Sequence, residues 1–189
     1  MRSVISAFFC FLILPLIISC GNSYELFQKD AKDWKTYGDA DWGFSDNTLI
    51  GKASGESGFV MTEQSYKDFI LELEFKPDST INSGVFVRCA KKELSATDCH
   101  ELNIWDLHPN QEYRTGAIVT KAIPLERIET LNKWNTYKIH VENNLIQVWV
   151  NDTLTADSNL EYPEKGFIGL QAQGTGEIHF RNISIKPIQ

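Results

Sequence analysis

The amino-acid sequence predicts an all-β domain in which antiparallel strands form a sandwich or a barrel. Apolar and polar residues alternate with the period of two that is typical of strands, short polar turns separate these segments, and no segment carries a convincing helical stripe. The chain has 189 residues, of which 42% are hydrophobic and 23% are charged. This composition fits one globular domain and excludes a disordered, collagen-like or coiled-coil chain.

The alternating segments follow one another along most of the chain. Residues 69–75 place four apolar side chains, Phe69, Leu71, Leu73 and Phe75, on one face with a period of two. The other segments are residues 85–88, 101–106, 137–142, 146–150, 167–172 and 178–185. Asn143-Asn144 and Asn151-Asp152 supply two connecting turns, because Asn tolerates positive φ. A short helical turn is an alternative only in residues 125–132.

The first 20 residues are a separate unit. Arg2 precedes the apolar run Val4–Ile18, which is short for a membrane span and typical of a secretory signal. The ending Ile17-Ile18-Ser19-Cys20-Gly21 resembles the lipobox of bacterial lipoproteins, which implies that Cys20 becomes the first, lipidated residue. An ordinary signal peptide with an incidental Cys is the alternative. We therefore expect a signal peptide in residues 1–19, a lipidated Cys and short tether in residues 20–29, and the domain in residues 30–189.

The lipobox also implies a place and a partner. A lipid on Cys20 would anchor the protein in the bacterial cell envelope, at the outer or inner membrane, facing the periplasm or the cell surface. The formal net charge is −7 and the isoelectric point is about 5.1. Because nucleic-acid binding requires a cationic face for phosphates, we expect no nucleic-acid partner.

The cysteines predict one disulfide. Cys10 leaves with the signal peptide and Cys20 carries lipid, so Cys89 and Cys99 remain to pair in an oxidising compartment. Two unpaired thiols are the alternative, and the scattered Cys and His residues have no zinc-site spacing. Successive side chains of a strand point to opposite faces, and we call the face that a residue takes its strand parity. Strand parity places Cys89 on the core side and Cys99 on the outer side. The bond therefore requires a frayed ladder or a β-bulge.

Strand parity also gathers polar side chains on one outer face. With the alternating valines of residues 85–87 in the core, Arg88 points outward; Glu101, Asn103 and Trp105 point outward for the same reason. Arg88 would donate two hydrogen bonds to sugar oxygens, Glu101 would act as an acid or base, and Trp105 would offer a flat apolar ring. A solvent-exposed Arg–Glu pair beside a half-buried Trp is the alternative.

Short motifs occur in a fixed order along the chain. They are Asn82-Ser83-Gly84-Val85-Phe86-Val87-Arg88, His100-Glu101-Leu102-Asn103-Ile104-Trp105-Asp106, Thr115-Gly116-Ala117-Ile118, Trp134-Asn135, Val150-Asn151-Asp152, Gly166-Phe167-Ile168-Gly169-Leu170-Gln171 and Phe180-Arg181-Asn182-Ile183. This order resembles the 3-keto-disaccharide hydrolase domain family (DUF1080). The resemblance runs from Trp34 to Lys186 and implies a concanavalin A-like (lectin/glucanase) jelly roll of two antiparallel sheets.

The resemblance implies hydrolysis of 3-keto-glycosides in a concave groove. A ketone at C3 acidifies the hydrogen at C2, so a base removes it, the glycosidic oxygen leaves by β-elimination, and water adds back. Glu101 is the candidate base, Arg88 the candidate enolate stabiliser, and His108 or the core-side His100 the candidate acid. The candidate substrate-binding residues are Asn103, Trp105, Asp106, Gln171 and Trp42.

Asp106 has an alternative role. A conventional glycosidase needs two carboxylates that flank the bond. Parity points Asp106 away from Glu101, so a strand-end turn is an equally good interpretation of this residue.

The sequence departs from the family pattern at three positions. Gln173 stands where the family commonly has His, Asn103 stands in place of Gln, and His100 stands in place of Tyr. Loss of the His removes the most natural proton shuttle near neutral pH. The alternative function is therefore a non-catalytic carbohydrate-binding lipoprotein on the same fold.

No cofactor or metal is expected. Asp39, Asp41 and Asp46 have a spacing similar to that of calcium loops, but the Gly and the closing Glu of an EF-hand are absent. Structural calcium in a lectin-like fold stays an alternative.

Overall fold

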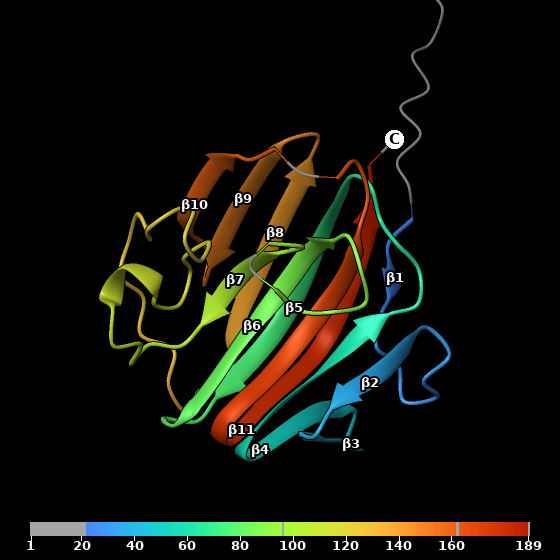
Figure 1. Cartoon of the computed structure of the whole chain (residues 1–189), viewed down its shortest axis with the longest axis vertical. Helices are drawn as coiled ribbons and strands as arrows, with labels where there is room; N and C mark the ends of the chain where they lie inside the picture. The colour runs from blue at the N-terminus through green and yellow to red at the C-terminus, as the bar shows by residue number, and fades with distance from the viewer. Residues whose placement is uncertain (1–21, 96, 162, 189) are drawn as a thin grey trace, which may run out of the picture.

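The strands form a sandwich of two antiparallel layers (Figure 1). The computed structural model describes residues 22–95, 97–161 and 163–188; the predicted signal peptide, residues 1–19, and the lipidation site Cys20 lie outside this part. The elements are β1 (Tyr24–Glu25), β2 (Trp34–Gly38), β3 (Asp41–Ser45), β4 (Thr48–Thr62), β5 (Phe69–Pro77), β6 (Ile81–Cys89), β7 (His100–Ile104), the short 3-10 helix η1 (Gln111–Tyr113), β8 (Asn135–Glu142), β9 (Leu145–Val150), β10 (Thr153–Asn159) and β11 (Phe167–Pro187). The predicted all-β jelly roll is confirmed.

Two long strands, β4 and β11, belong to both layers. Along Phe167–Gly174, β11 pairs with β6 and β4; along Ile178–Pro187 it pairs with β5 and with the start of β4. The ladder shifts after Gln173, where Gly174 and Gly176 adopt φ values of 81° and 111°. Because only glycine adopts such values readily, this is where the strand bends from one layer into the other.

We call the layers the front and back sheets. The front sheet has the order β7-β6-β11-β4-β2, and the back sheet has the order β10-β9-β8-β5-β11-β4-β3, with β1 beside the end of β11. Figure 1 shows β11 running through the middle of the molecule beside β4, β5 and β6. The apolar residues of the alternating segments meet between the two sheets; Phe69, Val85 and Leu102, for example, have no exposed surface.

Strand β6 contains one extra residue near its end. Gly169 of β11 pairs with Phe86, whereas Phe167, two residues earlier, pairs with Cys89, three residues later. Arg88 absorbs the difference with a φ of 56°. This β-bulge reverses the parity that regular alternation predicts, so Arg88 turns toward the back sheet and Cys89 turns outward.

The prediction that Arg88 lies on the outer face beside Glu101 is therefore wrong. The Arg88 side chain is buried, and its guanidinium donates to a carboxylate oxygen of Asp68 at 2.9 Å, to the carbonyl oxygen of Asn143 at 3.1 Å and to that of Glu164. These three residues lie in connections at one end of the back sheet. Arg88 thus joins the two sheets through a buried ion pair.

The same bulge accommodates a disulfide between Cys89 and Cys99. Because Cys89 turns outward after the bulge, it reaches the side of the sheet on which Cys99 lies, and the parity conflict disappears. The bond closes a loop whose Leu94 packs back on the front sheet and whose Lys92 donates to Glu63 at 2.9 Å.

The N-terminal segment differs from the predicted tether in residues 20–29. Leu26 and Phe27 are each only 2% exposed, β1 pairs with β11, and the Trp34 indole donates to the carbonyl oxygen of Gln28 at 2.7 Å. The folded domain therefore begins by Tyr24, because these side chains complete one edge of the core.

The connections agree with the predicted turns but not with the alternative of a short helical turn. Asn143, Asn151 and Asp152 adopt positive φ at the β8–β9 and β9–β10 turns. Residues 125–132 contain no helical turn, and η1 lies earlier in the chain. In the described part of the chain, no helix has the length and apolar character needed to cross a membrane.

Candidate functional site

The outer face of the front sheet carries three successive rows of side chains. Strand pairing places Met61, Gly169, Phe86 and Glu101 in the first row, Phe59, Gln171, Gly84 and Asn103 in the second, and Ser57, Gln173 and Asn82 in the third. The first row is largely apolar, whereas the next two are rich in amides. Glu101 lies at the boundary between these two environments.

The Glu101 side chain leans over Gly84. A Cβ atom on Gly84 would lie 3.3 Å from the Leu102 carbonyl oxygen and 3.4 Å from both Cγ and Oε1 of Glu101, so the Glu101 side chain lies directly beside Gly84. Burial raises the pKa of Glu101 to about 7, and no other cause contributes. Since no basic side chain in the described chain pairs with it, Glu101 can take up and release a proton near neutral pH.

An apolar cluster accounts for the burial of Glu101. It consists of Met61, Phe86, Cys89 and Cys99, with Leu94, Phe167, Phe59 and Tyr37 packed against it. We call it the disulfide cluster. Phe86 is directly opposite Glu101 in the β6–β7 pair, and Cys99 lies two residues before it on the same side. The cluster therefore forms an apolar wall beside the carboxyl.

The sequence contains a signal for this cluster that alternation alone misses. Phe59-Val60-Met61 is a continuous apolar run, and such a run is typical of a strand that is buried on both faces. In the structure Val60 faces the main core while Phe59 and Met61 face the disulfide cluster. The run therefore reflects a strand that is buried on both faces, with a second, smaller core on its outer face.

Two amide side chains beside Gly84 have unsatisfied acceptors. Asn103 is buried, and its amide nitrogen donates to the carbonyl oxygen of Tyr113, which leaves Oδ1 without a partner in the described chain. Oε1 of the buried Gln171 is likewise without a partner. Buried acceptors normally have a donor. A ligand hydroxyl, or the proton of a neutral Glu101, would supply one after a small side-chain movement.

Aromatic rings stand at both ends of these rows. Tyr37 and Phe59 stack with ring centroids 5.0 Å apart and an interplanar angle of 11°. At the other end Trp105 contacts His108 edge-on at 4.5 Å, and His108 contacts Tyr113 at 5.6 Å. Trp105 and Tyr113 are half-buried. Such rings offer flat apolar surfaces to the C–H face of a sugar.

The two histidines proposed as acids occupy different environments. His108 lies in the aromatic group, where its Nδ1 accepts from the Asn110 backbone N–H at 3.0 Å. His100 is buried on the core side, as parity predicts. Burial, with help from Lys121 and Arg88, lowers the pKa of His100 to about 3, so the ring is neutral. A ring that stays neutral and faces the core cannot protonate a leaving group on the outer face.

Two further site predictions do not fit the structure. The Asp106 carboxylate is buried and accepts from the backbone N–H of Thr130 at 2.6 Å and from its hydroxyl at 2.9 Å. It therefore holds the loop before β8, in line with the alternative of a strand-end turn. Trp42 lies on β3 in the back sheet, covering Gly51 and stacking near Phe180. Neither side chain belongs to the outer face of the front sheet.

The described residues offer no cluster of three or more His, Cys, Asp or Glu side chains that could hold a metal. Asp41 opens β3 and Asp46 follows its end, so a five-residue strand separates two of the carboxylates considered for calcium. That spacing corresponds to roughly 16 Å along a strand. The aspartates therefore do not converge on one ion.

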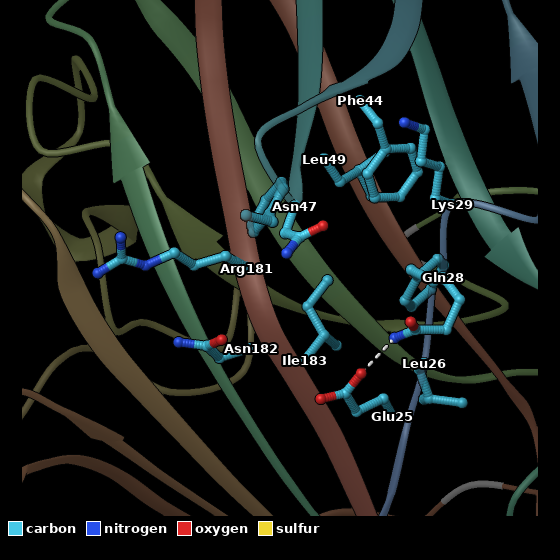
Figure 2. A pocket seen from close by; sticks show the side chains of 12 residues that line it. Glu25, Leu26, Gln28, Lys29, Phe44, Asn47, Leu49, Arg181, Asn182 and Ile183 are labelled. Carbon is cyan, nitrogen blue, oxygen red and sulfur yellow. Dashed lines mark hydrogen bonds between the residues drawn. The ribbon is translucent and has the colours of Figure 1, made fainter.

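A cavity of about 210 Å³ lies away from the rows (Figure 2). It occupies the gap along β11 between the start of β4 and β1, and none of the predicted site residues lines it. Figure 2 shows Glu25 bonded to Gln28 across its lower edge, and shows Arg181 and Asn182 pointing away from the other lining residues. Its charged groups are thus largely engaged within the chain.

The fold and the outer face define a class of protein. Two-layer jelly rolls with a carboxyl, amides and aromatic rings on one sheet face are suited to handling carbohydrates. The sequence profile of the 3-keto-alpha-glucoside-1,2-lyase-like domain family matches residues 23–186. The chain belongs to this family.

Solved structures agree with this assignment. The chain is similar to a Parabacteroides distasonis protein described as a candidate glycosyl hydrolase, with a TM-score of 0.77 and 25% identity over 88% of this chain and 99% of that one. It shares its fold with the carbohydrate-binding module CBM66 from Bacillus subtilis (TM-score 0.61, 17% identity, 83% and 97% coverage). It also shares its fold with a β-glucanase from Bacillus licheniformis (TM-score 0.63, 15% identity, 90% and 99% coverage).

No curated protein sequence matches the chain significantly. The family match and the structural neighbours together support a carbohydrate-related function.

Proposed function

We propose that this protein cleaves 3-keto-glycosides by elimination and hydration, with Glu101 as the base. The observation that carries the proposal is the position of Glu101, a carboxyl with a pKa of about 7 that leans over Gly84 between an apolar wall and two amide side chains. A base with a pKa near the working pH combines adequate basicity with a large deprotonated fraction. The family match supports the choice of substrate.

The chemistry balances with one base. Glu101 takes the C2 proton of the 3-keto sugar, and the electron pair of the C2–H bond delocalises onto the C3 oxygen to form the enolate. Collapse of the enolate breaks the C1–O bond, and the leaving oxygen gains a proton from the acidic form of Glu101 or from water. Water then adds at C1 while C2 regains a proton, and the net result is hydrolysis. A second flanking carboxylate is unnecessary, in contrast to conventional glycosidases.

The enolate needs a donor other than Arg88, which is buried on the far side of the sheet. Gln171 is the best candidate, because it lies beside Gly84 in the second row and its amide makes no hydrogen bond within the described chain. An amide N–H directed at the developing charge would stabilise the enolate oxygen. Trp105 would support the sugar ring from the neighbouring aromatic group.

The test is hydrolysis of nitrophenyl 3-keto-glucosides in D₂O by the purified protein. We expect nitrophenol release together with deuterium at C2 of the free 3-keto-glucose, because C2 is reprotonated from solvent. The matched glucoside that keeps its C3 hydroxyl is the control and should stay intact. Release of nitrophenol without deuterium at C2 would contradict the elimination route. If neither the α- nor the β-anomer of the nitrophenyl 3-keto-glucoside releases nitrophenol, the enzymatic proposal is contradicted.

A specific observation favours the second candidate, a carbohydrate-binding lipoprotein without catalysis. Gln173 replaces the family's His in the third row, where its Oε1 accepts from the Asn82 amide at 3.1 Å. This position therefore holds an amide pair instead of a titratable group. Calorimetric binding of a 3-keto-glycoside without turnover would support this alternative.

We also propose that Cys20 anchors the protein in the bacterial cell envelope. Because the domain begins by Tyr24, only three residues, 21–23, would separate it from the lipid. Metabolic labelling of the full chain with radioactive palmitate is expected to mark the wild type. Cys20→Ala should lose the label and leave the membrane fraction; equal labelling of both would contradict the proposal.

A further inference from the structure

The outer face of the back sheet carries a cavity of its own, of about 290 Å³. Strand pairing places Ser184, Glu72, Lys138 and Trp149 in one row and Glu74 beside Thr136 in the next, with Asn182 and Asp152 at the edges. The cavity lies among these side chains. Because the two outer faces point in opposite directions, it is separated from Glu101 by the whole core.

Trp149 is the aromatic group of this cavity. Its side chain is half-buried, and the Nζ atom of the exposed Lys138 lies 5.5 Å from the ring centroid. Trp134, which lies in the connection just before β8, is covered by the Arg181 guanidinium at 3.9 Å, and Glu74 fixes that guanidinium at 2.6 Å. Trp149 has only a flexible lysine beside it, so its ring is accessible to a ligand once Lys138 moves aside.

The polar lining offers both donors and acceptors. The exposed carboxylates of Glu72 and Asp152 make no hydrogen bond or ion pair within the described chain. Thr136 and Lys138 add a hydroxyl and an ammonium as donors. Such a mixture complements the hydroxyls of a sugar, each of which both donates and accepts. The excess of carboxylates disfavours anionic ligands.

We propose that this cavity is a second carbohydrate site, which binds one neutral sugar ring of a glycan. The ring packs its C–H face on Trp149, and its hydroxyls donate to Glu72 and Asp152. A volume at the lower end of the range for small-molecule pockets, about 300 Å³, suits a single ring. The proposal depends on the carbohydrate-related class of the protein and not on catalysis at Glu101.

With two sites on opposite faces, the back-sheet site would hold one part of a glycan while the front face acts on another end of that glycan. Binding of one segment raises the effective concentration of its neighbours at the other site. The second site would therefore increase retention on polymeric glycans and leave turnover of small substrates unchanged.

The test is a titration of the ¹⁵N-labelled protein with maltotetraose, cellotetraose and laminaritetraose, followed through the indole N–H resonances and, in every variant, through the backbone N–H resonances of residues that line the cavity. We expect saturable shifts of the Trp149 resonance with at least one of these sugars. Glu72→Ala, an exposed substitution that spares the core, should weaken that binding by roughly tenfold. Trp149→Ala should abolish it. Glu101→Gln should leave it unchanged, which separates this site from the proposed catalytic one.

Trp134→Ala is the matched control, because it removes a tryptophan next to β8 that the Arg181 guanidinium already covers. It should retain the affinity for the sugar that shifts Trp149. The proposal is overturned if none of the three sugars shifts the Trp149 resonance, or if Glu72→Ala and Trp149→Ala both bind as tightly as the wild type.

Discussion

Replacing Glu101 with Gln should stabilise the protein at alkaline pH, although it removes the proposed base. The folded-state pKa of Glu101 is about 7, whereas its ordinary value is 4.5, and burial is the cause. The folded protein therefore holds this proton more tightly than the unfolded chain does. The stability that Glu101 contributes is fully present below pH 4.5 and is lost as the pH rises through about 7.

The magnitude follows from the two pKa values. At about 1.4 kcal/mol for each pKa unit, the difference between 4.5 and about 7 corresponds to about 3 kcal/mol. Gln has nearly the same shape and never ionises, so Glu101→Gln avoids this loss. The free energy of unfolding of the variant minus that of the wild type should rise by about 3 kcal/mol between pH 4 and pH 8.

Urea denaturation of both proteins at a series of pH values measures this difference. Other titrating groups cancel in the subtraction, and any constant offset from the substitution itself does not affect the slope. Glu72→Gln, at an exposed position on the opposite face, is the control for the loss of one glutamate charge. A flat difference for Glu101→Gln between pH 5 and pH 8 would refute the burial of its carboxyl and the reasoning that makes it a base.

Three further predictions concern the Arg88 ion pair, the disulfide cluster and Gly84. Arg88→Met should cost about 3 kcal/mol in the free energy of unfolding, because it leaves the largely buried Asp68 carboxylate with the Asn143 N–H but without its cationic partner. Adding Asp68→Asn should recover part of the loss, and an additive loss would contradict the pairing. The double change Cys89→Ser and Cys99→Ser should lower the free energy of unfolding by about 2–3 kcal/mol. Because the apolar wall loosens, the midpoint of the acidic limb of the pH–rate profile should also move from about 7 to a lower pH. An unchanged midpoint would contradict the role of the disulfide cluster. Gly84→Leu should lower kcat at least tenfold, because a side chain of this length would fill the space that the Glu101 carboxyl occupies beside Gly84; an unchanged kcat would show that the carboxyl does not need this place.

The sequence predicts the core-facing pattern because burial between two sheets imposes strict alternation. Val85, Leu102 and Ile104 all lie where the period of two puts them, and so does Glu101 on the opposite face. The same reasoning places Gln171 correctly. Alternation is a reliable guide wherever a strand is regular and paired on both sides.

Arg88 could not be placed from the sequence, because one inserted residue reverses every later position. Neither Arg88 nor Cys89 carries a bulge signal of the kind that glycine gives, and the positive φ of Arg88 arises from tertiary pairing with β11. Alternation does point Asp106 away from Glu101, and the structure agrees with the interpretation of this residue as a strand-end turn. The candidate role of Trp42 rests on its residue type and on no strand assignment, so its position on β3 in the back sheet is not predicted.

The shared strand β11 has a consequence for how the chain acquires its structure. Residues 167–187 are the last strand, yet they pair with β1, β4, β5 and β6. Neither layer can close its hydrogen-bond ladder until this segment emerges from the ribosome. Contacts between such distant parts of the chain slow folding, so a nascent chain that stops before Gly166 should stay protease-sensitive, and protection should appear only once the C-terminal strand is complete.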